Sequence, residues 1–443
     1  MATTYLTRTQ GTPTDAKKYT FSTWVKLGRL KTDHDFMFGV RNDANNNNNF
    51  YFRSASDFVL TQENVVGGTA VGYFYTNRKF RDVSAWYHIV VAVDTSQVTS
   101  SNRVKVYVNG VQETSFSSIL YPTLNSNDII NTSGSLVFIG QKGGSYGYLD
   151  GSMAHVHFID GLAYPASTFG ETNAASGIWT PIVSPSVTYG TNGFFLKFGS
   201  SGALGTDSSV NSNTFTVNGP GTQTQDAPSN VFATWNPLIF YNNRTTTNGN
   251  TTFTNTATNW TSGFSTLSAS QSKWYVEIKP IAGSYNYFGI INSDDIYQAG
   301  ALNDGLGGAS IGQPAAIYQS SNGNKTINTV STSFGATFTS GDIIGMAVDL
   351  DNLKIYWSKD NVWQGGGDPT AGTGGITITG DTNYAVAIGC YAGSASQANF
   401  GNGYFGTTPV ASGNADGAGY GIFEYAPPTG YYSLCTKNIN TYG

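Results

Sequence analysis

The chain has 443 residues, a formal net charge of −5 and only 11% charged residues. The sequence contains no cluster of Lys and Arg. Because recognition of phosphates needs concentrated positive charge, we do not expect nucleic acid as a partner. The length is sufficient for two domains of about 200 residues, each with its own core.

Polar positions along the chain are mostly Thr, Ser, Asn and Gly, and aromatic residues make up 14% of the sequence. Helix surfaces prefer Glu, Lys and Ala, whereas aromatic and β-branched residues favour strands. The aromatic residues also supply more apolar surface than a disordered segment carries. We therefore predict a folded, all-β protein with many turns.

Residues 1–217 contain short segments in which apolar and polar residues alternate. These segments are, in order, "YTFSTWVKL", "FMFGVR", "NFYFRS", "AVGYFYTN", "WYHIVVAVD", "RVKVYVNG", "LVFIG" and "YLDGSMAHVHFIDG". Turns rich in Asn, Gly and Ser separate them, as in antiparallel sandwiches and jelly rolls. One polar run, residues 45–49, is expected to be a solvated loop, because five amides are costly to bury unpaired.

Two phrases repeat one pattern: "AVDTSQVTSSNRVKVYVNG" from Ala92 and "AVDLDNLKIYWSKDN" from Ala347. Each is typical of an apolar strand, a polar turn and a second, half-buried strand. The residues expected to point inward are Val104, Val106 and Val108 in the first copy and Leu353, Ile355 and Trp357 in the second; those expected outward are Lys105, Tyr107, Lys354 and Tyr356. The repeat favours two copies of one architecture.

Residues 218–230, "NGPGTQTQDAPSN", have no apolar periodicity, and we predict a linker there. The second unit, residues 231–443, has strand-like segments at "KWYVEIKP", "NYFGIIN", "AAIYQ", "DIIGMAVDL", "LKIYWSK" and "YAVAIGCY". The predicted fold is therefore two antiparallel β-sandwich domains of the jelly-roll kind in tandem, residues 1–217 and 231–443.

The beginning of the chain, "MATTYLTRTQ", has no basic start followed by an apolar stretch. We therefore expect synthesis in a cytoplasm without a signal peptide. The longest apolar run, near "IVVAV", is too short to span a bilayer, so no membrane insertion is expected. Cys390 and Cys435 are the only cysteines, and Cys390 is expected to be a buried free thiol.

Several segments resemble known modules. The segments "FSTWVKL", "WYHIVVAVD", "VKVYVNG" and "YLDGSMAHVHFIDG" resemble the laminin-G-like branch of the concanavalin A-like lectin superfamily. In the second unit, "KWYVEI", "GDIIGMAVDLDNLKIYWSKDN" and "YAPPTGYYSLCT" resemble a SPRY module of the same two-sheet superfamily. The join beginning "FIDGLAYPASTFGETNAASGIWTPI" is similar to a connection in structural and tail proteins of tailed phages, particularly marine ones. This resemblance implies a virion component and not a catalytic activity.

The superfamily resembled here includes glucanases, whose catalytic strand presents Glu-x-Asp-x-x-Glu. Two carboxylates on one face of the strand then act as nucleophile and acid. None of the five Glu in this chain is followed by Asp at +2 or Glu at +5, so we expect no enzymatic activity. Asp349 and Asp351 follow a predicted strand, where turn capping is favoured over acid-base work.

Metal sites have incomplete ligand sets in the sequence. His155 and His157 have the spacing of two ligands on one strand face, but no third His or Cys lies nearby. Some laminin-G-like modules hold calcium, and Asp33, Asp35 and Asp43 could supply oxygen ligands here. Hard cations need six or more oxygens, and no loop is dense in acids. We expect no cofactor, with calcium left open.

Aromatic residues in predicted turns are the candidates for ligand binding. The candidate residues are Tyr146, Tyr148, Tyr285, Tyr287, Trp363 and Tyr391. A sugar ring has an apolar face and a polar rim, so an exposed aromatic ring beside Asn, Gln or Asp suits it. The alternative is that these rings pack over the ends of the sandwich or in subunit contacts.

The leading functional hypothesis is a non-enzymatic phage virion protein, a tail- or fibre-associated adhesin that recognises host-surface glycan. The alternative is a head decoration or other structural subunit that uses its lectin-like folds for protein contacts only. Expected partners are other virion proteins and host-surface polysaccharide. A homo-oligomer, or many copies on the particle, would compensate for weak binding at each site.

Overall fold

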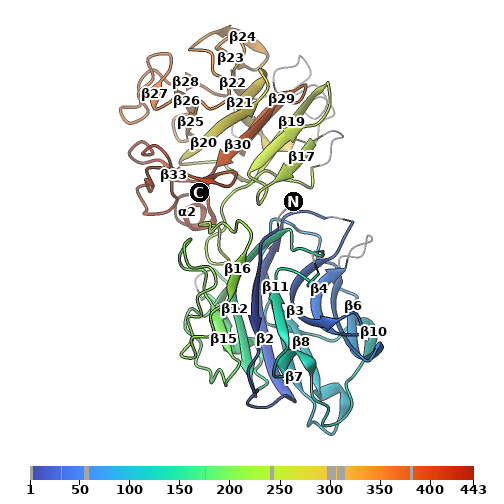
Figure 1. Ribbon diagram of the computed structural model, residues 1–443. Helices are drawn as coiled ribbons and strands as arrows, with labels where there is room; N and C mark the ends of the chain where they lie inside the picture. The colour runs from blue at the N-terminus through green and yellow to red at the C-terminus, as the bar shows by residue number, and fades with distance from the viewer. Residues whose placement is uncertain are drawn as a thin grey trace. The chain divides into compact units, whose positions relative to one another are not determined.

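The computed structural model describes residues 3–30, 32–53, 59–144, 146–174, 176–239, 244–296, 306, 315–379 and 383–443. Contacts divide the chain into two compact units, Met1–Gln223 and Thr224–Gly443 (Figure 1). Strands dominate both units, and one α-helix, α2 (Thr436–Tyr442), occurs among the described residues. The predicted all-β sandwich fold is confirmed. No helix in the described ranges has the length and apolarity needed to cross a membrane.

Two sheets form the sandwich of the first unit (Figure 1). The eight-stranded sheet has the order β10 (Phe116–Leu120), β6 (Thr69–Thr76), β5 (Val59–Val66), β4 (Asn46–Arg53), β3 (Asp35–Asp43), β11 (Leu136–Ile139), β1 (Tyr5–Thr9) and β16 (Thr216–Asn218). The six-stranded sheet has the order β15 (Phe194–Leu196), β12 (Gly151–Asp160), β2 (Lys18–Leu27), β7 (Tyr87–Asp94), β8 (Val104–Val108) and β9 (Val111–Glu113). Between the sheets, the buried rings of Phe21 and Phe38 stack with centroids 4.7 Å apart.

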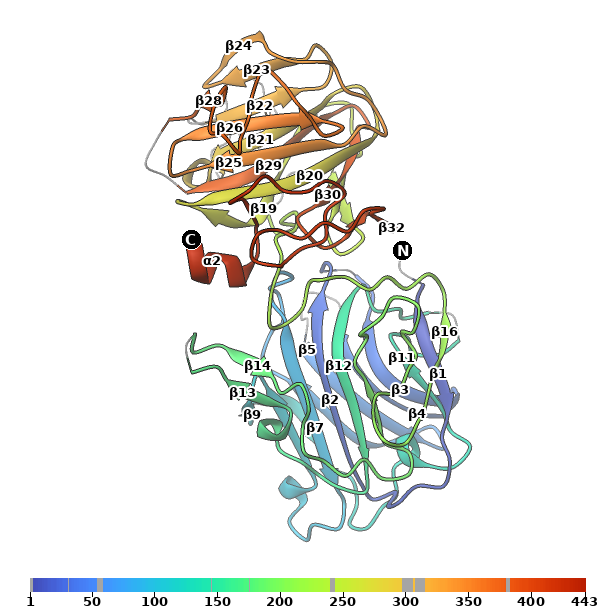
Figure 2. The same cartoon turned by 90° about the vertical axis from the view of Figure 1, so that its left-hand side faces the viewer.

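The outer face of the six-stranded sheet is covered as well. The short strands β13 (Gly170–Thr172) and β14 (Trp179–Pro181) lie beside β9 in Figure 2. Val90 and Ile159 on this face are buried together with Phe169, which follows β12 in the chain. The alternation in β2 predicts one buried face, but its outward residue Trp24 is also only 3% exposed. The second layer comes from the join after β12.

The second unit has the same two-sheet plan. Its nine-stranded sheet has the order β17 (Arg244–Thr247), β18 (Thr252–Asn255), β30 (Ala395–Asn399), β20 (Lys273–Ala282), β25 (Ile344–Asp349), β26 (Lys354–Lys359) and β27 (Val362–Trp363), with β28 (Ile376–Thr377) on β26 and β33 (Tyr432–Ser433) on β20. Its six-stranded sheet has the order β19 (Trp260–Ala269), β29 (Tyr384–Tyr391), β21 (Asn286–Asn292), β22 (Ala315–Gln319), β23 (Asn324–Ile327) and β24 (Val330–Ser333). A separate pair is β31 (Tyr404–Phe405) with β32 (Thr408–Pro409). The pairing of β33 with β20 is parallel, unlike that of the other named strands.

The repeated phrase forms equivalent hairpins, β7–β8 and β25–β26. Val93 pairs with Val104 in the first unit, and Val348 pairs with Ile355 in the second. The first hairpin has the longer turn, so Val104 occupies the position that Ile355 has in the second hairpin, two residues away from its place when the two phrases are aligned by sequence. A shift of two residues leaves each side chain on its predicted face. The inward residues Val106, Val108, Ile355 and Trp357 are buried, and Val104 and Leu353 pack against the cores while partly exposed.

The expectation that Tyr356 faces solvent is wrong. Its side chain is 2% exposed and packs with Tyr275, Phe423 and Tyr431 in a second apolar layer outside the nine-stranded sheet. Phe423 and Tyr431 belong to the C-terminal segment of the chain. The alternation correctly gives the side of the strand, but a segment distant in sequence covers that side.

Glu277 of β20 anchors this C-terminal segment. Its buried carboxylate accepts hydrogen bonds from the amides of Tyr425 and Glu424 at 2.7 and 2.9 Å. It also accepts from Asn399 Nδ2 at 3.0 Å and from the Tyr275 hydroxyl at 3.3 Å. Burial raises the pKa of Glu277 to about 7, while the four donors act in the opposite direction. The segment is therefore fixed by polar contacts as well as by aromatic packing.

The prediction of a solvated loop at residues 45–49 is wrong. Most of it belongs to β4, and Asn48 and Asn49 are 0% and 1% exposed. Asn48 Nδ2 donates to the Asp128 carboxylate at 2.7 Å, and Asn49 Nδ2 donates to Asn47 Oδ1 at 2.9 Å. Burial of these amides is tolerated because the Nδ2 groups of both side chains find acceptors inside the unit.

The division between the units falls inside the predicted linker, residues 218–230. Ordered contacts extend into this range from both sides. Asn218 ends β16 and pairs with Tyr5 of β1. From the other side, Asp226 Oδ1 accepts the Phe232 amide at 3.0 Å.

We expect fragments 1–223 and 224–443 each to fold alone, because each unit buries its own core. Calorimetry of the separately expressed fragments should give one cooperative transition for each. Two unfolded fragments, together with a single transition for the whole chain, would contradict the two-domain interpretation.

Candidate functional site

An aromatic platform lies at one end of the six-stranded sheet of the second unit. Trp260 begins β19, Tyr391 ends β29, and Tyr285 directly precedes β21. Trp260 pairs with Tyr391 across the sheet, and the Tyr391 amide donates to the Tyr285 carbonyl. Since these strands are neighbours in the order β19-β29-β21, three aromatic residues that are distant in sequence come together.

Ring distances define the platform, which consists of Trp260, Tyr285 and Tyr391. The Trp260 centroid lies 6.1 Å from that of Tyr285 and 5.3 Å from that of Tyr391, and the two tyrosine centroids are 5.6 Å apart. Tyr287 packs 4.7 Å from Trp260 and is 8% exposed. Tyr285 is 43% exposed, while Trp260 and Tyr391 are half-buried. The platform therefore presents aromatic surface supported by a buried ring.

Two buried asparagines hold the platform in place. Asn255 Nδ2 donates to the carbonyls of the residues just before Trp260 and Tyr391, at 2.6 and 2.9 Å. Asn286 Nδ2 donates to two carbonyls of the preceding turn at 3.1 and 3.3 Å, and this turn carries Tyr285. Both side chains are 1% exposed. Because each buried amide donates two hydrogen bonds to backbone carbonyls, the two asparagines fix the positions of the strand ends.

Exposed polar residues adjoin the platform in sequence. Thr258 and Asn259 precede Trp260, and Ser284 precedes Tyr285. A pyranose ring offers an apolar face for stacking and hydroxyl groups for hydrogen bonds at its rim. The arrangement of apolar rings beside short polar side chains fits such a ligand.

The other predicted site residues lie elsewhere. Trp363 is in β27 of the nine-stranded sheet, half-buried against the cluster that contains Tyr356. In the first unit, Tyr146 is 45% exposed, with the Arg41 and Lys142 cations 5.7 and 5.6 Å from its ring centroid. Tyr148 is half-buried beside another tyrosine, Tyr5. The structure thus brings together three of the six candidates, Tyr285, Tyr287 and Tyr391.

Trp260 is absent from the set predicted from the sequence. It stands in "TNTATNWTSGF", after a polar stretch and at the start of a strand. A large aromatic residue that directly follows exposed turn residues is a usable signal. Its position opposite Tyr391 depends on strand order, which the local sequence does not contain.

His155 and His157, the pair with metal-ligand spacing, pack among aromatic rings. A bulge in β12 separates the two residues, and His155 has a φ of 48°. The His157 ring stacks on Phe195 with centroids 4.0 Å apart, and His157 Nδ1 hydrogen-bonds the Tyr189 hydroxyl at 3.0 Å. His157 Nδ1 is therefore engaged by the tyrosine hydroxyl, and both imidazole rings lie against Phe195.

His88 belongs to the same outer layer. Its ring stacks on Trp24 at 4.7 Å, its Nδ1 accepts from Trp179 Nε1 at 3.0 Å, and its Nε2 hydrogen-bonds the Ser22 hydroxyl at 2.9 Å. Burial lowers the pKa of His88 to about 3, that of His155 to about 4 and that of His157 well below its usual value. All three side chains are therefore neutral at pH 7.

The acidic residues considered for calcium are engaged in local contacts. Asp33 and Asp43 accept backbone amides in their own turns, and Asp35 accepts the Asp150 amide at 2.8 Å. Among the residues that the structure describes, no group of three or more His, Cys, Asp or Glu is placed to hold a metal ion.

The two turn aspartates behave as predicted. Asp349 accepts from the amide and from Nδ2 of Asn352, at 3.0 and 2.9 Å, and it forms an ion pair with Lys273 at 2.9 Å. Asp351 accepts the Ser272 amide at 2.7 Å. Capping and pairing account for both carboxylates. Cys390 is a buried free thiol, as predicted, and Cys435 is also free.

A family comparison agrees with the two-sheet fold of the first unit. Residues 1–166 match the Laminin_G_3 model, described as the concanavalin A-like lectin/glucanases superfamily. This part of the chain is a concanavalin A-like domain, as the resemblance of its strands implies. No curated protein matches the chain.

Similar solved structures include a SPRY domain, a bacterial protein and a pentraxin. The SPRY domain of human HERC1 is 13% identical, with 37% of this chain and 96% of that chain covered and a TM-score of 0.25. A Bacteroides ovatus protein named as a candidate carbohydrate-binding protein is 14% identical, with 49% and 56% covered and a TM-score of 0.35. A heptameric pentraxin from Limulus polyphemus is 19% identical, with 36% and 71% covered and a TM-score of 0.27. These likenesses are too distant to carry a functional conclusion.

Proposed function

We propose that this protein is a non-catalytic glycan-binding protein of a phage particle, carried on the tail or a tail fibre, where it recognises a host-surface polysaccharide. The observation that carries glycan binding is the aromatic platform of Trp260, Tyr285 and Tyr391. Three rings meet at one sheet end, with Tyr285 43% exposed, and they offer aromatic surface to the apolar face of a sugar. Its fixed position means that little conformational entropy is lost on binding.

The particle context is supported by the join after β12. The join, which begins "FIDGLAYPASTFGETNAASGIWTPI" and continues through "YGTNGFFLKF", "LGTDSS" and "PSNVFATWNP", is similar to a connection in phage structural and tail proteins. In this chain Ala166, Phe169 and Trp179 of the join pack on the outer face of the six-stranded sheet. A subunit repeated on a particle presents many identical sites. Multivalent display would raise the avidity of individually weak sugar contacts by orders of magnitude. Other virion proteins are the partners that this location requires.

A second candidate function is a decoration subunit that uses its folds for protein contacts. The edge strand β24 favours it, because all four of its residues are exposed and Val330 is 63% exposed. An unpaired strand edge is a template for pairing with another chain. In this case the platform would be covered by a neighbouring subunit.

Replacing Trp260 by Ala in the full chain should weaken saccharide affinity about tenfold, which corresponds to about 1.4 kcal/mol, because a central aromatic anchor is lost. Calorimetric titration with the oligosaccharide that binds best on an array would measure this change. Tyr391→Ala should act in the same direction.

The control is Tyr146→Ala, which removes a ring in the first unit that is 45% exposed, against 43% for Tyr285 of the platform. Its affinity should equal that of the unchanged protein. Unchanged melting of the second unit in Trp260→Ala would show that binding, and not folding, is affected. Equal affinities for Trp260→Ala and the unchanged protein would exclude the platform as the glycan site.

A further inference from the structure

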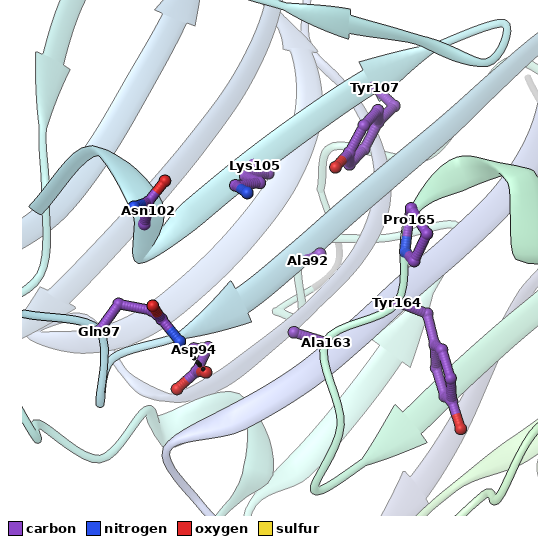
Figure 3. Close-up of a pocket in the computed structure, with 9 residues that line it drawn as sticks. All are labelled: Ala92, Asp94, Gln97, Asn102, Lys105, Tyr107, Ala163, Tyr164 and Pro165. Carbon is purple, nitrogen blue, oxygen red and sulfur yellow. Dashed lines mark hydrogen bonds between the residues drawn. The ribbon is translucent and has the colours of Figure 1, made fainter. Parts of the chain in front are cut away.

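A polar groove lies on the outer face of the first unit, whereas the aromatic platform belongs to the second unit. It encloses about 320 Å³, near the lower end of the range of ligand sites, about 300 to 1,000 Å³. Its lining residues are Ala92, Asp94, Gln97, Asn102, Lys105, Tyr107, Ala163, Tyr164 and Pro165 (Figure 3). All of them lie within the concanavalin A-like domain, residues 1–166.

The fold explains why this part of the face is open. Lys105 and Tyr107 project from the outward side of β8, and Ala92 pairs with Lys105 across β7–β8. The small Ala92 side chain leaves a hollow, and Ala163 lies on the other side of it (Figure 3). Pro165 continues that wall. The join covers the sheet beyond this point and leaves the groove between itself and the hairpin turn.

The equivalent hairpin of the second unit shows the closed alternative. There Ala347 pairs with Tyr356, as Ala92 pairs with Lys105 in the first unit. Ala347 and Tyr356 are buried under Phe423 and Tyr431. The first unit instead places a cationic residue where the second has a buried ring. The same hairpin position is therefore covered by aromatic side chains in the second unit and is polar and open in the first.

The groove offers hydrogen-bonding groups that no protein contact uses. Within the described ranges, the side chains of Lys105, Asn102 and Tyr107 have no hydrogen-bond or ion-pair partner. Asp94 is oriented by Ser96, whose hydroxyl donates to it at 2.5 Å, and by Gln97 Nε2 at 2.8 Å. These hydrogen bonds hold the pKa of Asp94 below its usual value against the opposing effect of burial.

We infer that this groove is a second saccharide-binding site, which takes a neutral pyranose without a metal ion. The Lys105 ammonium and the Asn102 amide can donate to sugar hydroxyls, and Asp94 can accept from one. Tyr107 offers a ring to the apolar face of the sugar. The lining contains one carboxylate, Asp94, and one ammonium, Lys105, so these residues carry no net charge, which disfavours anionic sugars. The same pair disfavours a divalent cation, which needs several oxygen ligands.

The inference rests on the proposed glycan binding but uses residues separate from the platform. The test therefore starts from the full chain with the platform removed by Trp260→Ala and Tyr391→Ala. Saturation-transfer NMR would use a panel of neutral methyl pyranosides and one methyl uronide at millimolar concentration. A neutral pyranoside should still receive signal from this protein, and addition of EDTA should leave that signal unchanged.

Two further changes in that background locate the signal. Ala92→Leu fills the hollow and should abolish the transfer, and Lys105→Met, which keeps the length of the stem, should reduce it at least about fivefold. Lys79→Met, at an exposed lysine outside the groove, is the matched control and should have no effect. Thermal melting would confirm that each variant folds, and Lys105→Met keeps the test valid if Ala92→Leu does not.

The groove site is overturned if a folded Ala92→Leu protein, or a folded Lys105→Met protein, retains the full signal. It is also overturned if EDTA removes the signal, if the uronide is preferred, or if the platform-deleted protein binds no pyranoside. These results leave the platform proposal standing, because that proposal depends on Trp260→Ala in the otherwise unchanged chain. Conversely, unchanged affinity in Trp260→Ala with loss in Ala92→Leu would reject the platform and support the groove.

Discussion

Ile355→Asp is expected to unfold the second unit while the melting transition of the first unit remains. Ile355 is 0% exposed and lies in the core between the two sheets of its unit. An unpaired carboxylate in such a place costs on the order of several kcal/mol, and the lost apolar contacts add about 2 to 5 kcal/mol. A domain is stable by only about 5 to 15 kcal/mol. Calorimetry of the full chain should therefore show one transition instead of two.

Lys354→Gln is the control one position away. Its ammonium donates to the Thr377 hydroxyl at 2.7 Å at the surface, and its loss should change the free energy of unfolding by less than about 1 kcal/mol. Val106→Asp should remove the first transition in the same way, because Val106 is 2% exposed. Equal damage from Lys354→Gln and Ile355→Asp would show that the faces of the hairpin are misassigned.

Mild acid is expected to destabilise the first unit selectively. His88, His155 and His157 are packed in its outer aromatic layer, and burial lowers the pKa of each. The second unit contains no histidine, since all four histidines of the chain precede residue 158. Lys197 lies near His155 and opposes its protonation further.

The stability of the first unit falls as the pH falls, because its folded and unfolded states bind different numbers of protons. Below the usual histidine pKa of about 6.5, the unfolded unit binds protons that the folded unit excludes. Stability is therefore complete above pH 6.5 and is lost as the pH falls toward the folded values of about 4 for His155 and about 3 for His88. Each excluded proton costs about 1.4 kcal/mol per pH unit. Three such groups give at most about 4 kcal/mol per pH unit.

Melting curves between pH 7 and pH 4.5 measure this loss. His88→Gln should flatten the pH dependence of the first transition, because glutamine keeps polar contacts to Ser22 and Trp179 without titrating near this range. The comparison concerns the slope with pH and not the absolute stability, which the substitution also changes. A first transition with the same slope in His88→Gln as in the unchanged protein would contradict the assignment of His88 to this effect.

The strands could be predicted from the sequence because alternation reports the inward face of each strand. The inward positions Val106 and Ile355 are buried as predicted. Coverage of the outer face could not be predicted, since Tyr356 is buried by residues near the end of the chain. The buried Asn48 has its partner, Asp128, 80 residues further along the chain. Long-range contacts of this kind leave no local signal.

The candidate site could be predicted in part. The local sequence shows that Tyr285 and Tyr391 are aromatic residues near predicted turns. The contact between their rings depends on the strand order β19-β29-β21. The same order adds Trp260 and separates Trp363, which lies on the other sheet. The groove at Lys105 depends on which residues the join leaves uncovered. Its open state becomes apparent only beside the closed hairpin of the second unit.

The intact protein is expected to bind glycan. The most direct measurement is an array of bacterial surface glycans probed with the multimerised full chain, because multivalency offsets weak affinity at single sites. Binding to at least one polysaccharide, reduced when Trp260 and Tyr391 are replaced by Ala, is the predicted result. Absence of binding to every glycan, with Trp260 found packed against a neighbouring subunit in the particle, would contradict the claim and leave the decoration role.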